Sequence, residues 1–149
     1  MFKRVLVVCT GNICRSPMGA ALLKHACESI DIVSAGLHAL DGHGADPLAI
    51  ELMAQRGIDI ESHVARQLTR ETAVSADLIL VMEAAQKRDI ESWLPETRGR
   101  IFRFLESRAI DVPDPYRKSR QHFSLTLDLM VEGTADWVAK LGMPAVTGK

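Results

Sequence analysis

The strongest constraint on the fold is a short buried strand that runs directly into a loop and then into a helix start. The strand is the run RVLVV at 4–8, whose β-branched side chains are typical of a strand buried on both faces. The sequence CTGNICRSP follows at 9–17, where Ser16 is the expected N-cap and Pro17 the expected first helical residue. This order predicts a strand, a tight loop and a helix that extends to about Glu28.

The rest of the chain repeats the alternation of short apolar strands with helices. Further strands are expected at 31–36, 76–82 and 100–105, and further helices at 47–55, 84–92 and 123–141. Two prolines exclude helix and central strand from 109–116, which is therefore expected to be a loop. The segment 36–47, rich in Gly, His and Asp, is expected to be a second loop.

Short strands that alternate with helices indicate an α/β fold with a parallel sheet covered on both faces. No repeat, low-complexity tract or linker divides the chain, so we expect a single three-layer domain over 1–149. Ligands of such sheets bind at the carboxyl ends of the strands. The loop at 9–17 follows the first strand at that end, which makes it the expected binding site.

Charge and apolar patterning exclude several classes of protein. The net charge is −1 without a basic run, which argues against binding to nucleic acid or to a membrane surface. No apolar stretch approaches the roughly 20 residues that span a bilayer, and the start MFKRVLVV does not fit a signal peptide. We therefore expect a cytoplasmic protein, in which Cys9, Cys14 and Cys27 are thiols and not structural disulfides.

The loop at 9–17 has the composition of an anion site with a nucleophile. Its backbone N–H groups and the following helix start form an anion cradle, and Gly11 and Asn12 suit positive φ angles. Arg15 can bind two phosphate oxygens at once. The same field favours the thiolate of Cys9, and Ser16 can donate a hydrogen bond to its sulfur. A thiolate that faces a bound phosphate predicts a phosphocysteine intermediate.

The stretch VCTGNICRSP resembles the signature loop of the low-molecular-weight protein tyrosine phosphatases. The resemblance continues through SAG (34–36), SHVARQ (62–67), DLILVME (77–83) and DPYRKS (114–119) and so covers nearly the whole chain. The form VPDPYRKSR is similar to the bacterial branch, whose usual partners are tyrosine autokinases of capsule and exopolysaccharide export. The resemblance implies a four-stranded parallel sheet with helices on both faces. It also implies hydrolysis of phosphotyrosine, with a phosphotyrosine protein as partner and no cofactor.

The resemblance also implies roles for individual residues. Cys9 corresponds to the nucleophile, Arg15 to the phosphate clamp and Asp114 to the general acid, which later activates water as a base. Asn12 and Ser16 correspond to loop supports, and the phosphate-binding loop comprises Thr10, Gly11, Asn12, Ile13, Cys14 and Ser16. Eukaryotic members carry two tyrosines after Asp-Pro, whereas this chain has Tyr116 followed by Arg117.

The residues alone leave several roles open. Asp111 competes with Asp114 as the acid because it lies three residues earlier. Tyr116 is either a wall for the substrate ring or a loop anchor, and Cys14 either fills space or acts as a resolving thiol for an oxidised Cys9.

Four further polar residues and two candidates for the core complete the expectations. His63 is expected to support the phosphate loop together with Ser34. His38 and His43 could bind a metal with Cys9 or Cys14, but no zinc-type spacing is present, so no metal is expected. Cys27 and Trp137 are expected in the core.

Three other functions compete with the phosphatase. A thiol-dependent arsenate reductase shares the fold and the loop, but its chemistry uses further cysteines in the second half, and none follows Cys27. A non-catalytic module that binds phosphate or a phosphopeptide would not need Cys9, Arg15 and Asp114 together. A dinucleotide-binding domain lacks its Gly-x-Gly-x-x-Gly after the first strand.

Overall fold

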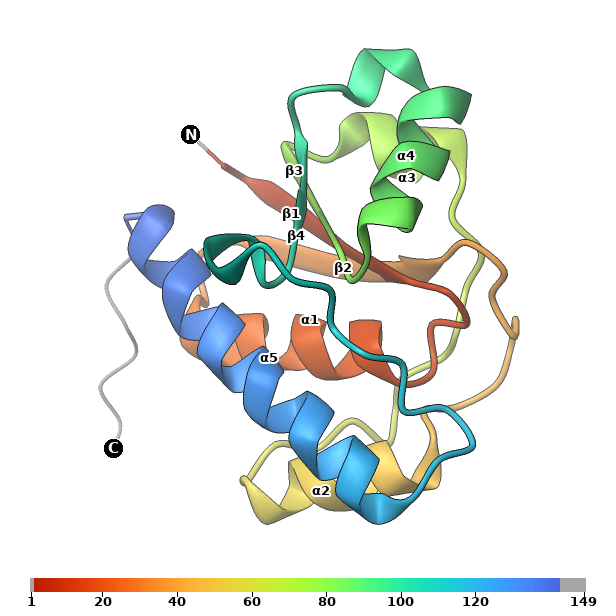
Figure 1. Ribbon diagram of the computed structural model, residues 1–149, viewed down its shortest axis with the longest axis vertical. Coiled ribbons are helices and arrows are strands. Elements are labelled where there is room, and N and C mark those ends of the chain that lie inside the picture. Colours follow the sequence, from red (N-terminus) through yellow and green to blue (C-terminus); the bar gives the residue numbers. More distant parts are fainter. Residues whose placement is uncertain (1, 143–149) are drawn as a thin grey trace.

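The centre of the structure is a four-stranded parallel sheet with the strand order β2-β1-β3-β4 (Figure 1). The structure is a computed structural model that describes residues 2–142. Its strands are β1 (Arg4–Cys9), β2 (Asp31–Gly36), β3 (Leu78–Val81) and β4 (Ile101–Arg103). Its helices are α1 (Arg15–Ala26), α2 (Pro47–Gln55), α3 (Arg70–Ser75), α4 (Ala84–Trp93) and α5 (Arg120–Lys140), with 3₁₀ turns η1 (Pro95–Thr97) and η2 (Glu106–Arg108). The predicted α/β class with four parallel strands is confirmed.

Helices cover both faces of the sheet, as the strand pattern predicts. In Figure 1, α1, α2 and α5 lie on one face of the sheet, and α3 and α4 lie on the other. Alternate residues of β1 enter two cores: Val5 and Val7 pack in the core on the α1 side, whereas Leu6 and Val8 pack in the core with residues of α3 and α4. Trp137 of α5 is buried in the first core. No helix within residues 2–142 is both long and apolar enough to span a membrane.

The start of α1 differs from the prediction. The helix begins at Arg15 with Cys14 at the N-cap position, and no side chain caps it. Ser16 therefore lies inside the first turn, and its hydroxyl accepts a hydrogen bond from Asn12 Nδ2 at 2.7 Å. The prediction that Ser16 caps the helix and Pro17 is its first residue is wrong, because this hydroxyl is bonded within the loop.

Helix α3 is an element that the sequence pattern missed, as are the 3₁₀ turns η1 and η2. It has six residues, and its N-cap Thr69 accepts a hydrogen bond from the backbone N–H of Thr72 at 3.2 Å. The helix is too short to show an apolar stripe in the sequence. It packs against β1 through the buried Ala73. Strands β3 and β4 are also shorter than predicted. After β4 the apolar residues Phe104 and Leu105 lie in a turn, although both are buried.

The strands end together at one edge of the sheet. Cys9 of β1 is opposite Gly36 of β2, and Val8 is opposite Val81 of β3. The loops that follow these strands therefore meet there, and the segment after β4 joins them because Val112 donates its N–H to Met82 O at 2.8 Å. This is the edge where parallel sheets bind ligands.

Two glycines allow α1 and α5 to pack closely against Phe104. A Cβ added to Gly133 of α5 would lie 2.8 Å from the backbone oxygen of Phe104. A Cβ added to Gly19 of α1 would lie 2.7 Å from Met130 Cε, the end of a flexible side chain. The two positions therefore differ in how far the neighbouring atoms can move.

We predict that Gly133→Ala destabilises the protein more than Gly19→Ala. Both substitutions gain about 1 kcal/mol of helix propensity, so their difference reports packing alone. Overpacking against backbone costs typically about 1–3 kcal/mol, and at Gly19 the methionine can move aside. Urea denaturation measures the two free energies of unfolding. Equal stability of the two variants would contradict the packing argument.

Candidate active site

The backbone carbonyls of the loop between β1 and α1 are occupied by the neighbouring segment 37–46. Four of them accept backbone N–H donors over 2.8–3.1 Å: Cys9 from Leu37, Thr10 from His38, Gly11 from Leu40 and Ile13 from Asp46. The N–H groups of residues 10–14, by contrast, donate to no acceptor in the part of the chain that the structure describes. The loop therefore offers a set of backbone donors to an oxyanion.

Asn12 holds the loop in its shape. Its φ is +58°, and its side-chain amide donates to Ser16 Oγ at 2.7 Å and to Ser34 Oγ at 3.1 Å. Its Oδ1 accepts from the N–H of Arg66 at 3.0 Å, and its carbonyl accepts from His63 Nε2 at 2.7 Å. An asparagine tolerates this left-handed backbone better than most residues, and here four hydrogen bonds from three segments fix it.

These contacts test two local expectations about the loop. The positive φ is found at Asn12 and not at Gly11, so the prediction for Gly11 is wrong. A Cβ at Gly11 would meet Ile13 and Leu40 at 3.7 and 4.0 Å, which places this residue beside the two apolar side chains. The structure brings Ser34 and His63 to Asn12, and it adds Arg66, which sequence reasoning did not single out although SHVARQ contains it.

His63 supports the loop as a neutral side chain. Burial lowers the pKa of its imidazole, and the charges of Lys24 and Arg66 lower the pKa further, against the opposing effect of its hydrogen bond to Asn12. The neutral ring can carry its proton on Nε2 and donate it to the Asn12 carbonyl.

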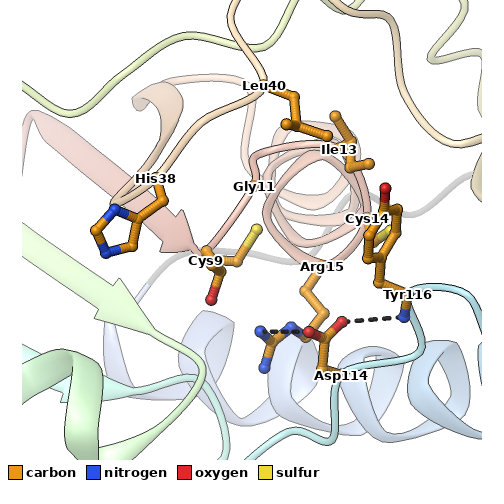
Figure 2. A pocket seen from close by; sticks show the side chains of 10 residues that line it. Cys9, Gly11, Ile13, Cys14, Arg15, His38, Leu40, Asp114 and Tyr116 are labelled. Carbon is orange, nitrogen blue, oxygen red and sulfur yellow. Dashed lines mark hydrogen bonds and ion pairs between the residues drawn. The ribbon is translucent and has the colours of Figure 1, made fainter.

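The sulfur of Cys9 lies at the entrance of the loop, next to a hydroxyl. Cys9 Sγ is 3.0 Å from Ser16 Oγ. Since Ser16 Oγ already accepts from Asn12, its own proton is available to the sulfur. Figure 2 shows the sulfur pointing toward the inside of the turn that runs from Gly11 to Arg15. A thiolate in this place faces the free backbone donors.

Arg15 is buried and held from one side. Its Nη1 donates to Glu83 Oε2 at 2.6 Å and to the carbonyl of Val112 at 2.9 Å. Within residues 2–142, Nε has no acceptor, and Nη2 has only the ion-pair contact with Asp114 Oδ2 at 3.7 Å. These two nitrogens are the pair that can bind two oxygens of one anion in parallel. Glu83 and Val112 were not among the predicted residues; Glu83 ends the quoted stretch DLILVME, but nothing in its spacing shows what it contacts.

The structure separates the two candidate acids. Asp114 borders the cavity with Cys9, and its Oδ2 is 3.7 Å from Arg15 Nη2 (Figure 2). Its Oδ1 accepts from the N–H of Tyr116 at 3.0 Å, which orients the carboxyl group. Asp111 instead accepts from Ala84 N at 3.0 Å and lies 3.1 Å from an Arg103 nitrogen, so it holds the start of α4.

The cavity above the loop has a polar floor and apolar walls. Its volume is about 150 Å³, and Ile13, Leu40 and Tyr116 border its mouth. Figure 2 shows Tyr116 and Ile13 on one side of Cys9 and His38 on the other. Leu40 and His38 were not predicted as lining residues, because a loop pattern does not show which of its side chains face a cavity.

Cys14 lines the cavity as a thiol. Burial raises the pKa of the Cys14 thiol, and the charges of Asp46, Cys9 and Asp114 raise it further, against a smaller opposing effect of Arg15. Cys14 therefore stays protonated where Cys9 offers its sulfur to the loop. All three cysteines are free in the structure, and a role for Cys14 as a resolving thiol stays a prediction.

Thr10 and Gln86 connect the loop to α4. Gln86 donates from Nε2 to Thr10 Oγ1 at 3.2 Å, while its Oε1 accepts from the N–H groups of Met82 and Glu83. Glu83, which binds Arg15, is thus itself held by Gln86, and Gln86 also bonds to the loop.

We predict that His63 makes the stability of the protein depend on pH. The unfolded chain takes up this proton near the ordinary pKa of about 6.5, whereas the folded protein takes it up only at lower pH. The free energy of unfolding should therefore fall as the pH drops below about 6.5 toward the lowered pKa of the folded state. His63→Gln, which keeps an N–H donor, should flatten this slope in urea denaturation between pH 7 and 5.

The matched control for this prediction is His25→Gln, which changes an exposed histidine of α1. Its pH profile should match that of the wild type. Parallel profiles of the wild type and His63→Gln would show that His63 is not the group responsible.

Known proteins match the chain over nearly its whole length. The family model described as low molecular weight phosphotyrosine protein phosphatase matches residues 4–145. The probable low molecular weight protein-tyrosine-phosphatase EpsP of Ralstonia solanacearum is 49% identical over 141 residues, which are 95% of this chain and 97% of EpsP.

Solved structures agree with this match. The tyrosine phosphatase Wzb from Escherichia coli K30 in complex with sulphate superposes with a TM-score of 0.92 and 39% identity, over 95% of this chain and 100% of that chain. The YwlE arginine phosphatase from Geobacillus stearothermophilus superposes with a TM-score of 0.87 and 29% identity, over 94% of this chain and 93% of that chain. Together with the matched model, these similarities confirm the resemblance, and the chain belongs to the low molecular weight phosphotyrosine protein phosphatase family.

Proposed function

We propose that the protein hydrolyses phosphotyrosine in proteins through a phosphocysteine intermediate. The observation that carries the proposal is the convergence of three groups on one cavity. The Cys9 sulfur, the free backbone donors of residues 10–14 and the Nε–Nη2 pair of Arg15 face the same space, and Asp114 borders it.

The first step transfers the phosphoryl group to Cys9. The thiolate attacks phosphorus in line with the tyrosyl oxygen, so a P–S bond forms as the P–O bond breaks. The loop N–H groups and Arg15 hold the three equatorial oxygens, whose charge they stabilise in the transition state. The leaving phenolate has a pKa near 10, so it takes a proton from the carboxyl group of Asp114 as it departs.

The second step releases phosphate. Asp114, now a carboxylate, takes a proton from a water molecule that attacks the phosphorus of the phosphocysteine. The P–S bond breaks, inorganic phosphate leaves, and Cys9 returns to the thiolate. Ser16 donates its hydroxyl proton toward the departing sulfur, from which its oxygen is 3.0 Å away. The cycle uses side chains and backbone groups of this chain alone.

The walls of the cavity support an aromatic substrate. Ile13, Leu40 and Tyr116 can pack against the faces of a phenyl ring whose phosphate reaches the loop. The comparison with an arginine phosphatase of the same fold raises phosphoarginine as a second substrate. Ile13 and Leu40 favour the ring, since neither side chain offers an acceptor to the N–H donors of a guanidinium.

The physiological substrate that we propose is a tyrosine autokinase of polysaccharide export. The similarity of VPDPYRKSR to the bacterial branch supports this partner, and EpsP and Wzb, whose names mark them as protein-tyrosine phosphatases, are among the relatives. The cytoplasmic location expected from the sequence stays a prediction.

We predict that Cys9→Ser lowers the turnover of a phosphotyrosine peptide about 10⁴-fold or more, as the loss of other covalent nucleophiles does. The variant should still bind inorganic phosphate, because the loop donors and Arg15 remain. Steady-state kinetics and calorimetric titration measure the two properties. Cys27→Ala, which changes a buried cysteine at the far end of α1, is the control and should stay active.

The same experiment tests the substrate. A peptide of identical sequence with phosphoarginine in place of phosphotyrosine should be a much poorer substrate for the wild type. Substantial activity of Cys9→Ser would remove Cys9 as the nucleophile, and a preference for phosphoarginine would overturn the proposed substrate.

We predict that Asp114→Asn lowers the rate most where the leaving group is poor. With phenyl phosphate the loss should reach about 10²–10⁴-fold, the usual contribution of general acid catalysis. With p-nitrophenyl phosphate the loss should be smaller, because nitrophenolate leaves with less proton assistance. Asp111→Asn should show no such dependence, since its carboxylate is bound to Ala84 and Arg103. A leaving-group dependence in Asp111→Asn alone would reverse the assignment.

A further inference from the structure

A second hollow adjoins the cavity of the proposed active site. Its volume is about 440 Å³, and the residues that line it are Leu37, His38, Gln67, Leu68, Asp89 and Trp93. His38 borders both hollows, and Figure 2 shows it on the side of Cys9 away from Tyr116. A peptide whose phosphotyrosine enters the cavity can therefore continue past His38 into this second space, which we name the Trp93 hollow.

The floor of the Trp93 hollow is held in place by hydrogen bonds. Gln67 donates from Nε2 to Leu37 O at 2.6 Å, accepts from Ala39 N at 2.9 Å and donates its backbone N–H to Asp41 at 2.8 Å. Leu68 donates its N–H to Gly36 O at 2.8 Å. The amide of Gln67 is thus bonded within the protein. The polar and aromatic side chains left to contact a ligand in the hollow are those of His38, Asp89 and Trp93, and of these only Asp89 is acidic.

Asp89 and Trp93 present one face of α4 to the hollow. They are four residues apart, so they lie next to each other on the helix surface. Trp93 is 50% exposed, unlike Trp137, whose indole N–H donates to Phe104 O in the core. Asp89 is exposed and forms no salt bridge with any residue from 2 to 142. Arg88, its neighbour in sequence, points to another face of the helix.

A carboxylate beside an exposed indole is suited to a cation. The ring face attracts an ammonium or guanidinium group, and the carboxylate accepts its hydrogen bonds. The opposite rim of the active-site cavity carries Arg117, which stacks over Tyr116 at 5.3 Å from the ring centre, and Asp114, which is protonated when it acts as the general acid. The charge of this rim during the first step is therefore positive. A basic side chain of a substrate is therefore attracted to one rim and repelled from the other.

We propose that the Trp93 hollow binds a lysine or arginine side chain that lies within a few residues of the phosphotyrosine, on one side of it only. This proposal rests on the proposed function, because it names a sequence feature of the same phosphoprotein substrate. Asp89 and Trp93 are then specificity-determining residues for the choice among phosphotyrosine sites.

The test is a lysine scan of a phosphotyrosine peptide. A single lysine is moved through four positions on each side of the phosphotyrosine, and each peptide is paired with one that carries glutamine there. The wild type should prefer lysine about threefold to thirtyfold in kcat/KM, the range of one exposed ion pair with one exposed cation–π contact. The preference should occur on one side only and should shrink as the salt concentration rises.

Three variants assign the preference to the hollow. Asp89→Asn and Trp93→Ala should each reduce the preference for lysine, and Trp93→Phe should retain part of it because a ring face remains. All three should hydrolyse p-nitrophenyl phosphate like the wild type, since this substrate fills only the cavity. Glu28→Gln removes the same charge beyond the far end of α1 and should leave the preference intact.

Each outcome decides the proposal. Equal kcat/KM for the lysine and glutamine peptides at every position would overturn it, as would a preference that survives in both Asp89→Asn and Trp93→Ala. A proportional loss of p-nitrophenyl phosphate hydrolysis in these variants would show a structural role and would also overturn it. Each of these three results leaves phosphotyrosine hydrolysis by the wild type standing. A wild type that cleaves none of the peptides would instead remove the proposed function and this proposal together.

Discussion

The left-handed backbone of Asn12 is the constraint on which the rest of the site depends. It turns the chain between β1 and α1 so tightly that the N–H groups of residues 10–14 meet no acceptor among the described residues 2–142. Such a conformation is costly for a residue with a side chain, and it persists here because Ser16, Ser34 and His63 all bond to Asn12. The loop is thus shaped by segments that lie far from it in sequence.

Arg15 is likewise held by a residue outside the loop, in this case through an ion pair. A buried guanidinium needs a partner for its charge, and Glu83 supplies it at 2.6 Å through Nη1. That contact leaves the positive charge next to the loop and turns the Nε–Nη2 edge toward the cavity. Glu83 is fixed in turn by Gln86, which also bonds to Thr10. The start of α4 therefore sets the position of the phosphate clamp, although it follows β3 and not β1.

The sequence predicts what depends on local pattern and misses what depends on pairing between segments. The apolar runs of β1 and β2 and the loop order Cys-x5-Arg are local, and both the sheet and the convergence of Cys9 with Arg15 follow from them. Helix α3 is too short for a periodic pattern, and Ser16 leaves its expected cap because Asn12 binds it. Asp111 and Asp114 look equivalent in a loop with two prolines; their separation depends on contacts with α4 and with Arg15 that no spacing encodes.

The parts of the site that hold phosphate and the parts that choose the substrate are built differently. In the reaction that we propose, phosphate meets backbone donors and a buried arginine, whose positions are over-determined by hydrogen bonds from several segments. The ring and the flanking residues of a substrate meet exposed side chains instead, Leu40 and Tyr116 at the mouth and Trp93 beyond His38. Exchanging an exposed side chain costs little stability, so recognition can change while the chemistry is kept. The fold thereby places the groups for the reaction on a fixed loop, and it places the groups for specificity on the exposed rim of the cavity.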